Sequence, residues 1–62
     1  MERKIERVTM HKAGRTMIME ICEDADRYTG KRAYIQGSTG YYEMDKLDAA
    51  IAACDSVERV TL

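Results

Sequence analysis

Only one stretch of this 62-residue chain has the periodicity of an α-helix, and it lies at residues 45–55, DKLDAAIAACD. Leu47, Ile51 and Cys54 recur at the spacing of four and three residues that defines one helical face. Asp45 has the short acceptor side chain that is typical of a helix N-cap. A helix of this length is only marginally stable by itself in water, so it is expected to pack against the rest of the chain.

The other segments alternate between apolar and polar residues with the two-residue period of β-strands. The expected strands cover residues 4–12, 16–23, 31–36, 41–44 and 56–62. Ala13-Gly14 predicts a tight hairpin between the first two, although Ala-Gly is a weaker turn signal than Asn-Gly. The second strand has apolar residues on both faces, which favours a central position. We therefore expect one α+β domain over residues 1–62, an antiparallel sheet of four to five strands with one helix, from the C-terminal half, packed on one face.

Two segments near the ends of the chain resemble each other, IERVTM at 5–10 and VERVTL at 57–62, and four of the six positions are identical. The shared pattern predicts that four apolar side chains face the core: Val8, Met10, Val60 and Leu62. It also predicts that Arg7 and Arg59 both face away from the core. If hairpins connect the strands between them, the last strand runs antiparallel to the first and can pair with it.

The chain shows none of the residue patterns that catalysis or metal binding requires. The only histidine, His11, is expected on a strand, and no serine or cysteine lies at a spacing that would bring it within reach as a nucleophile. Cys22 and Cys54 have no metal-ligand spacing, and we expect them to be small apolar residues in a reducing compartment. Asp24 and Asp26 resemble the start of a calcium loop, but no closing Glu follows, so a solvated turn is favoured. So short a chain also leaves little room for a substrate pocket. We therefore expect no enzymatic activity, no metal and no cofactor.

The first residues, MERKIERV, lack the apolar run of a signal peptide, and no apolar segment approaches the length of a membrane-spanning helix. We therefore expect a cytoplasmic protein that does not contact membranes. The core of such a short chain is thin, and oligomerisation commonly compensates for this. One narrow helical stripe cannot cover both apolar faces of strand 16–23, which predicts a homodimer.

Basic and aromatic side chains gather on the face of the predicted sheet that points away from the helix. The candidate binding residues are Arg7, His11, Arg32, Tyr34 and Arg59. Arginine and tyrosine are enriched at the hot spots of protein interfaces. These residues favour a small, non-enzymatic protein-interaction module, such as an inhibitor or accessory protein that binds the surface of another protein.

The same residues support an alternative, a module that binds single-stranded nucleic acid by stacking bases on its tyrosine rings. The succession of several strands and one helix is similar in architecture to the transcriptional coactivator family of small dimeric sheet proteins that bind single-stranded DNA. The likeness is in the order of elements, and no motif extends it residue by residue. The net charge of −1 argues against this alternative, because nucleic-acid-binding domains are usually basic. Protein interaction is therefore the favoured hypothesis.

Overall fold

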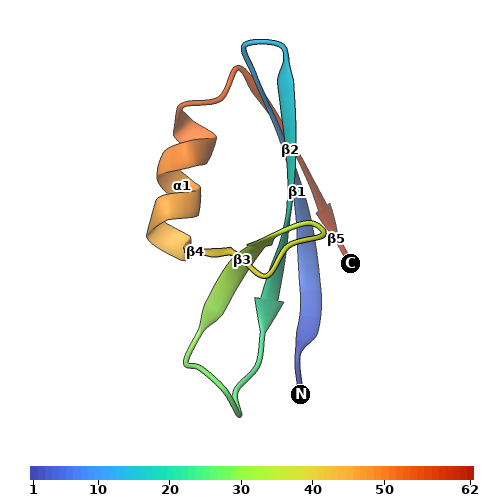
Figure 1. Ribbon diagram of the computed structural model, residues 1–62, viewed down its shortest axis with the longest axis vertical. Helices are drawn as coiled ribbons and strands as arrows, with labels where there is room; N and C mark the ends of the chain where they lie inside the picture. Colours follow the sequence, from blue (N-terminus) through green and yellow to red (C-terminus); the bar gives the residue numbers. More distant parts are fainter.

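The computed structural model describes all residues from 1 to 62 and shows a single antiparallel sheet with one helix against one face (Figure 1). The strands are β1 (Arg3–Lys12), β2 (Arg15–Glu23), β3 (Lys31–Ile35), β4 (Tyr41–Glu43) and β5 (Ser56–Thr61), and the helix is α1 (Met44–Ala52). Their order in the sheet is β4-β3-β2-β1-β5. The predicted α+β class, with five strands and a helix in the C-terminal half, is confirmed, and β2 lies at the centre of the sheet as expected.

The two longest strands, β1 and β2, form a hairpin in the interior of the sheet. Ala13 and Gly14 connect the two strands with φ angles of 51° and 75°. A type I′ turn requires positive φ at both central positions, and this turn suits the right-handed twist of the strands. Near the other end of β1 the register shifts between Lys4 and Glu6. Ile5 is the inserted residue of this bulge, and its side chain packs against the core.

The core lies between α1 and the face of the sheet that α1 covers, which we call the helix face. It comprises Val8, Met10, Met19, Ile21, Ala33 and Leu47. Leu47 is the one fully buried side chain of α1. The helix contacts β3 and β4, and its course leaves the far end of the β1–β2 hairpin less well covered. Met17 is accordingly 39% exposed although it lies on the helix face.

Helix α1 begins one residue before the predicted N-cap. Glu43 is the N-cap, with extended backbone angles (φ −65°, ψ 156°), and its side chain makes no capping hydrogen bond. The prediction that Asp45 caps the helix was wrong, because β4 runs directly into α1 with no loop residue between them. Asp45 lies instead in the first turn, where its carboxylate accepts a hydrogen bond from the Lys46 N–H at 2.8 Å. A negative charge there is favoured by the helix dipole.

Strand β5 pairs antiparallel with β1, as the resemblance between the two terminal segments predicted. The register, however, sets Arg59 opposite Val8 and Val60 opposite Arg7. Directly opposed residues point to the same face of a sheet, so Arg59 lies on the helix face and Val60 on the other face. The predictions that Val60 and Leu62 face the core and that Arg59 faces away from it were wrong, and Val60 and Leu62 are 52% and 50% exposed.

The physical reason is the packing of Val57. This side chain follows α1 and lies opposite Met10, where it packs against the core. That contact sets even-numbered residues of β1 opposite odd-numbered residues of β5. Two segments with the same sequence pattern therefore present opposite faces, because a shift of one residue turns every side chain of a strand to the other face.

Candidate functional site

The face of the sheet opposite α1, which we call the outer face, carries four of the five predicted binding residues. Arg7 and Tyr34 both lie opposite Glu20, on its two neighbouring strands. His11 lies opposite Thr16, and Arg32 lies opposite Cys22 on the same face. Cross-strand pairing thus brings four of the candidates to one surface. Arg59 is not among them.

Glu20 occupies the centre of the outer face and is 8% exposed. The Nζ of Lys4 lies 3.3 Å from its Oε1, and the Nη2 of Arg7 lies 3.8 Å from its Oε2. A largely buried carboxylate requires such partners, because its desolvation is costly when it is unpaired. The Nε of Arg7 is itself buried without a hydrogen-bond partner. The predicted binding residue Arg7 therefore neutralises Glu20.

Arg32 is held between two tyrosine rings. The central carbon of its guanidinium lies 4.2 Å from the ring centre of Tyr28 and 4.3 Å from that of Tyr41. The ring centre of Tyr34 lies 5.6 Å from that of Tyr41, at an interplanar angle of 47°. A hydrogen bond to Tyr34 is the main cause that raises the pKa of Arg32. We call these four residues the Tyr/Arg cluster.

Two members of this cluster were missed in the sequence analysis. Tyr41 was expected to lie on a strand, but its alignment beside Tyr34 depends on the β3–β4 register. Tyr28 lies in the connection between β2 and β3, where no periodicity indicates the direction of a side chain. Its hydroxyl is buried without a hydrogen-bond partner.

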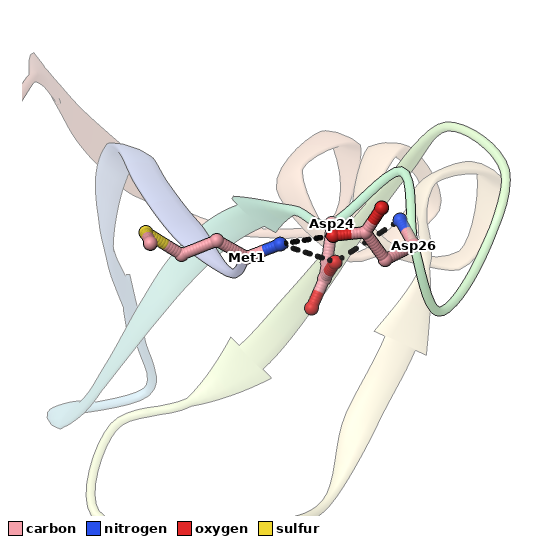
Figure 2. A network of polar contacts seen from close by, with 3 residues as sticks. All are labelled: Met1, Asp24 and Asp26. Carbon is pink, nitrogen blue, oxygen red and sulfur yellow. Dashed lines mark hydrogen bonds and ion pairs between the residues drawn. The ribbon is translucent and has the colours of Figure 1, made fainter.

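The turn that holds Tyr28 is organised by Asp24, which is 3% exposed. The Tyr28 N–H donates to the Asp24 carbonyl oxygen at 3.0 Å. Figure 2 shows the α-amino group of Met1 between two carboxylates, 3.1 Å from Oδ1 of Asp24 and 2.6 Å from Oδ2 of Asp26. Burial acts to raise the pKa of Asp24, but the ammonium group and the Asp26 N–H outweigh it, so this pKa is lowered. The two aspartates of the suspected calcium loop thus bind a cation that belongs to the chain.

The charges of the outer face balance. On the strands its bases are Lys4, Arg7 and Arg32 and its acids are Glu20, Glu43 and Glu58, and Glu2 and Arg27 add one charge of each sign beside the Tyr/Arg cluster. Each acid lies near a basic or imidazole group. Glu43 lies opposite Arg32 on the neighbouring strand without an ion pair between them, and the Nε2 of His11 lies 3.3 Å from Oε1 of Glu58. Such a surface offers no excess of positive charge to a nucleic-acid backbone.

The structure also brings a hydroxyl to His11 that the sequence spacing did not indicate. The Nδ1 of His11 lies 3.1 Å from Oγ1 of Thr16, while its Nε2 contacts Glu58. This order of hydroxyl, imidazole and carboxylate is formally that of a catalytic triad. The Glu58 side chain is 74% exposed, however, and all three groups lie on the open surface of the sheet. Water competes for each of these contacts, so we interpret them as a polar ladder across three strands.

Arg59 forms an ion pair on the helix face. Its Nε and Nη2 donate to the two carboxylate oxygens of Glu6 at 2.8 Å and 2.9 Å. The hydrogen bond from Arg59 is the main cause that lowers the pKa of Glu6, and the same contact raises the pKa of Arg59. This predicted binding residue therefore joins β1 to β5.

Two hollows of the surface differ in character. One, of about 580 Å³, lies beside the Tyr/Arg cluster and is bordered by Lys4, Glu20 and the loop at 37–39. The other, of about 660 Å³, is mostly apolar and lies between the second half of α1 and the tip of the β1–β2 hairpin. Both hollows are open to solvent, so the expectation that the chain has little room for a substrate pocket stays a prediction. The short side chains of Ala50 on α1 and of Ala53, the C-cap residue that follows it, leave the second hollow open.

The two cysteines differ in burial, and neither forms a disulfide. Cys22 is buried, and burial is the main cause that raises the pKa of its thiol, which disfavours the reactive thiolate. Cys54 donates to the Ala50 carbonyl oxygen at 3.1 Å, and both cysteines are free. No group of three or more His, Cys, Asp or Glu side chains is placed to hold a metal ion. The structure has no helix with the length and hydrophobicity needed to cross a bilayer.

In comparisons with protein-family models, with curated proteins and with solved structures, nothing matches this chain.

Proposed function

We propose that this chain is a non-enzymatic protein-interaction module that binds another protein through the outer face of its sheet. The observation that carries the proposal is the stacking of Arg32 between Tyr28 and Tyr41, with Tyr34 beside them. Arginine and tyrosine dominate interface hot spots, and side chains that are already held in place lose little conformational entropy on binding.

The chemistry of the cluster indicates what a partner would present. Arg32 makes no ion pair within the chain, since none of the ion pairs in the structure includes it. Its guanidinium is therefore available to a carboxylate of the partner, which it can bind with two parallel hydrogen bonds. The ring of Tyr41, 43% exposed, offers an apolar contact beside it. A protein surface with an acidic side chain next to an apolar or aromatic one fits both groups.

The proposal is tested by affinity capture with immobilised chain, comparing the wild type with Tyr41→Ala and Arg32→Ala. Lys46→Ala is the matched control, since Lys46 lies exposed on α1. We expect the wild type and the control to retain the same partner, and the two cluster variants to bind it about 30-fold more weakly, as hot-spot truncations do. Circular dichroism confirms that each variant is folded. Equal binding by all four proteins would refute the role of the outer face.

Binding of single-stranded nucleic acid is a second candidate, because the rings of Tyr28, Tyr34 and Tyr41 lie together with Arg32. The balanced charge of the outer face argues against it. Fluorescence anisotropy with a labelled oligothymidine distinguishes the two. We expect no binding at about 150 mM salt, the range in which phosphate contacts are already weakened. Binding that persists there and is lost in Tyr34→Ala would replace the protein-interaction proposal with this one.

We also propose that the chain is a homodimer in the cytoplasm. Only 9 of its 62 residues are buried, and the half-exposed apolar side chains of Val60 and Leu62 lie at one edge of the sheet. An unpaired strand edge is a ready template for association. The two free thiols support the proposed location, because thiols stay reduced in the cytoplasm. Sedimentation at tens of micromolar tests the dimer, and a species of 7.1 kDa would contradict it.

A further inference from the structure

We infer that two copies of this chain join through antiparallel pairing of their β5 strands, with the two-fold axis passing through Val60. The inference rests on the proposed homodimer and specifies its surface and register. It is independent of the Tyr/Arg cluster, which lies near the opposite edge of the sheet.

The two edge strands of the sheet differ in the number of unpaired backbone N–H and C=O groups that they can offer to another strand. Strand β4 covers only Tyr41–Glu43 and runs directly into α1, whereas β5 covers Ser56–Thr61. The Leu62 N–H donates to the Ile5 carbonyl oxygen at 3.0 Å. Hydrogen-bonding direction alternates along an antiparallel strand, so Val60 also bonds toward β1. The N–H and C=O groups of the alternate residues, Arg59 and Thr61, therefore point out of the sheet toward solvent.

Symmetry limits how two such edges can pair. A two-fold axis that relates antiparallel neighbours in one sheet stands perpendicular to that sheet, so each face continues into the same face of the partner. Opposed residues must then share a face, and the pairing must be centred on a single residue.

Charge selects among these centres. A centre at Glu58 would set Glu58 against the partner's Glu58, and a centre at Arg59 would set two arginines against each other. Like charges directly opposite are destabilising. A centre at Ser56 or Val57 would limit the pairing to at most Ser56–Glu58, because residues 53–55 form a turn, and a centre at Thr61 would limit it to Val60–Leu62. A centre at Val60 opposes no like charges and extends from Glu58 to Leu62.

In this register Val60 lies opposite the partner's Val60 on the outer face, where each is otherwise 52% exposed. Arg59 lies opposite the partner's Thr61, and their outward backbone groups form the hydrogen-bonded pair. The guanidinium of Arg59 is already bound to Glu6, so no unpaired charge becomes buried. The two sheets then form one continuous sheet with both helices on one side and both Tyr/Arg clusters on the other.

Cysteine cross-linking tests the register. Val60→Cys is made in a Cys54→Ala background, which leaves only the buried Cys22, and the protein is oxidised mildly. Opposed side chains of a non-hydrogen-bonded pair have Cβ atoms about 4.5–5.5 Å apart, close to what a disulfide needs. We expect most of the chain to migrate as a covalent dimer on non-reducing gels. Glu58→Cys is the control, because its two copies would lie roughly 13 Å apart along the strands and should not cross-link.

A proline substitution tests whether the outward backbone groups of β5 form the pairing. Thr61→Pro removes an amide hydrogen that points away from β1, so the fold of one copy is retained, as proline is tolerated on the outer side of an edge strand. Thr61→Ala keeps that hydrogen. We expect the wild type and Thr61→Ala to sediment as dimers and Thr61→Pro as a monomer.

The outcomes separate the two proposals. A monomeric wild type would refute the homodimer and this inference together. A dimer that survives Thr61→Pro, with no cross-link through Val60→Cys, would preserve the homodimer and overturn pairing through β5. If Thr61→Pro does not fold, the contrast between the cross-linking of Val60→Cys and Glu58→Cys decides.

Discussion

The ion pair of Glu6 and Arg59 has nearly ideal geometry, with two parallel hydrogen bonds of 2.8 Å and 2.9 Å. It lies next to the bulge at Ile5 and links β1 to the edge strand β5. The Arg59 side chain is 43% exposed, so solvent screens the interaction. Its contribution is therefore that of a well-formed surface pair, about 0.5–1 kcal/mol, and its pH dependence identifies it.

Glu6→Gln is expected to lower the free energy of unfolding by about 0.5–1 kcal/mol at pH 7. The pKa of Glu6 is lowered in the folded state below its usual 4.5, chiefly by the hydrogen bond from Arg59. A depressed carboxyl pKa stabilises the fold above about pH 4.5, and this contribution is lost as the pH falls through the folded-state pKa. Urea titrations at a series of pH values should therefore show the wild type and the variant converging below pH 4.5. A difference that is the same at every pH would show that the ion pair is not its cause.

Ala13 is the only residue other than glycine with a positive φ, 51°, in the whole structure. A left-handed conformation costs an ordinary L-residue roughly 1–2 kcal/mol, whereas asparagine tolerates it. Ala13→Asn is therefore expected to raise the free energy of unfolding by about 0.5–1 kcal/mol, measured by urea denaturation.

Gly14→Ala is the matched counterpart of this substitution. Its φ is 75°, and an added Cβ would meet no atom within 4 Å, so only backbone strain opposes the change. It should lower the free energy of unfolding by about 1 kcal/mol. Opposite signs for the two variants would establish the type I′ turn in solution, and equal signs would contradict it.

Among the elements, helix α1 has backbone N–H groups at its start that no capping side chain satisfies. Glu43 is the N-cap, but its side chain makes no capping hydrogen bond. Glu43→Asp supplies a shorter acceptor and keeps a negative charge opposite Arg32. We expect it to raise the free energy of unfolding by about 0.5–1 kcal/mol, measured by thermal denaturation, while Glu43→Ala should give no gain. Stabilisation by both variants would point to relief of some other strain at this position.

The strands and the helix were predictable because each carries its own period. Apolar residues recur with a 3.6-residue period over residues 45–52. Apolar and polar residues alternate in β1 and β2, and Ala13-Gly14 signals the turn between them. The face that β5 presents was not predictable in the same way. It depends on the contact of Val57 with the core beyond the end of α1, and a difference of one residue reverses the face of Arg59.

The candidate site was likewise predictable from the sequence only in part. Arg7, His11, Arg32 and Tyr34 could be assigned to one face from alternation within their strands. Their chemical environment could not, because it depends on cross-strand neighbours. Only the pairing register shows that Arg7 neutralises Glu20 and that Tyr41 lies beside Tyr34. The position of Tyr28 depends on a turn held by Asp24, for which the sequence has no periodic signal.

Over the whole molecule, the single helix covers the sheet unevenly. It runs from β4 toward the tip of the β1–β2 hairpin and ends short of that tip (Figure 1), where Met17 is 39% exposed, and five of the six residues of β5 are exposed. The Tyr/Arg cluster lies near the β4 edge of the outer face, and β5 lies at the other edge. The edge proposed for self-association and the surface proposed for a different partner therefore lie at opposite edges of the sheet.

The proposed pairing through β5 would make stability depend on protein concentration, because a dimer of folded chains separates when the chains unfold. An interaction that only the folded state makes stabilises it by about 2.7 kcal/mol when the concentration of the partner is about a hundred times the Kd. The melting temperature of the wild type is therefore expected to rise between low-micromolar and high-micromolar samples in thermal denaturation followed by circular dichroism. Thr61→Ala, which keeps its backbone hydrogen, should behave in the same way. Thr61→Pro should melt at one temperature throughout that range, close to the value of the most dilute wild type. A wild-type melting temperature that does not change with concentration would mean that the exposed edge of β5 remains unpaired in solution.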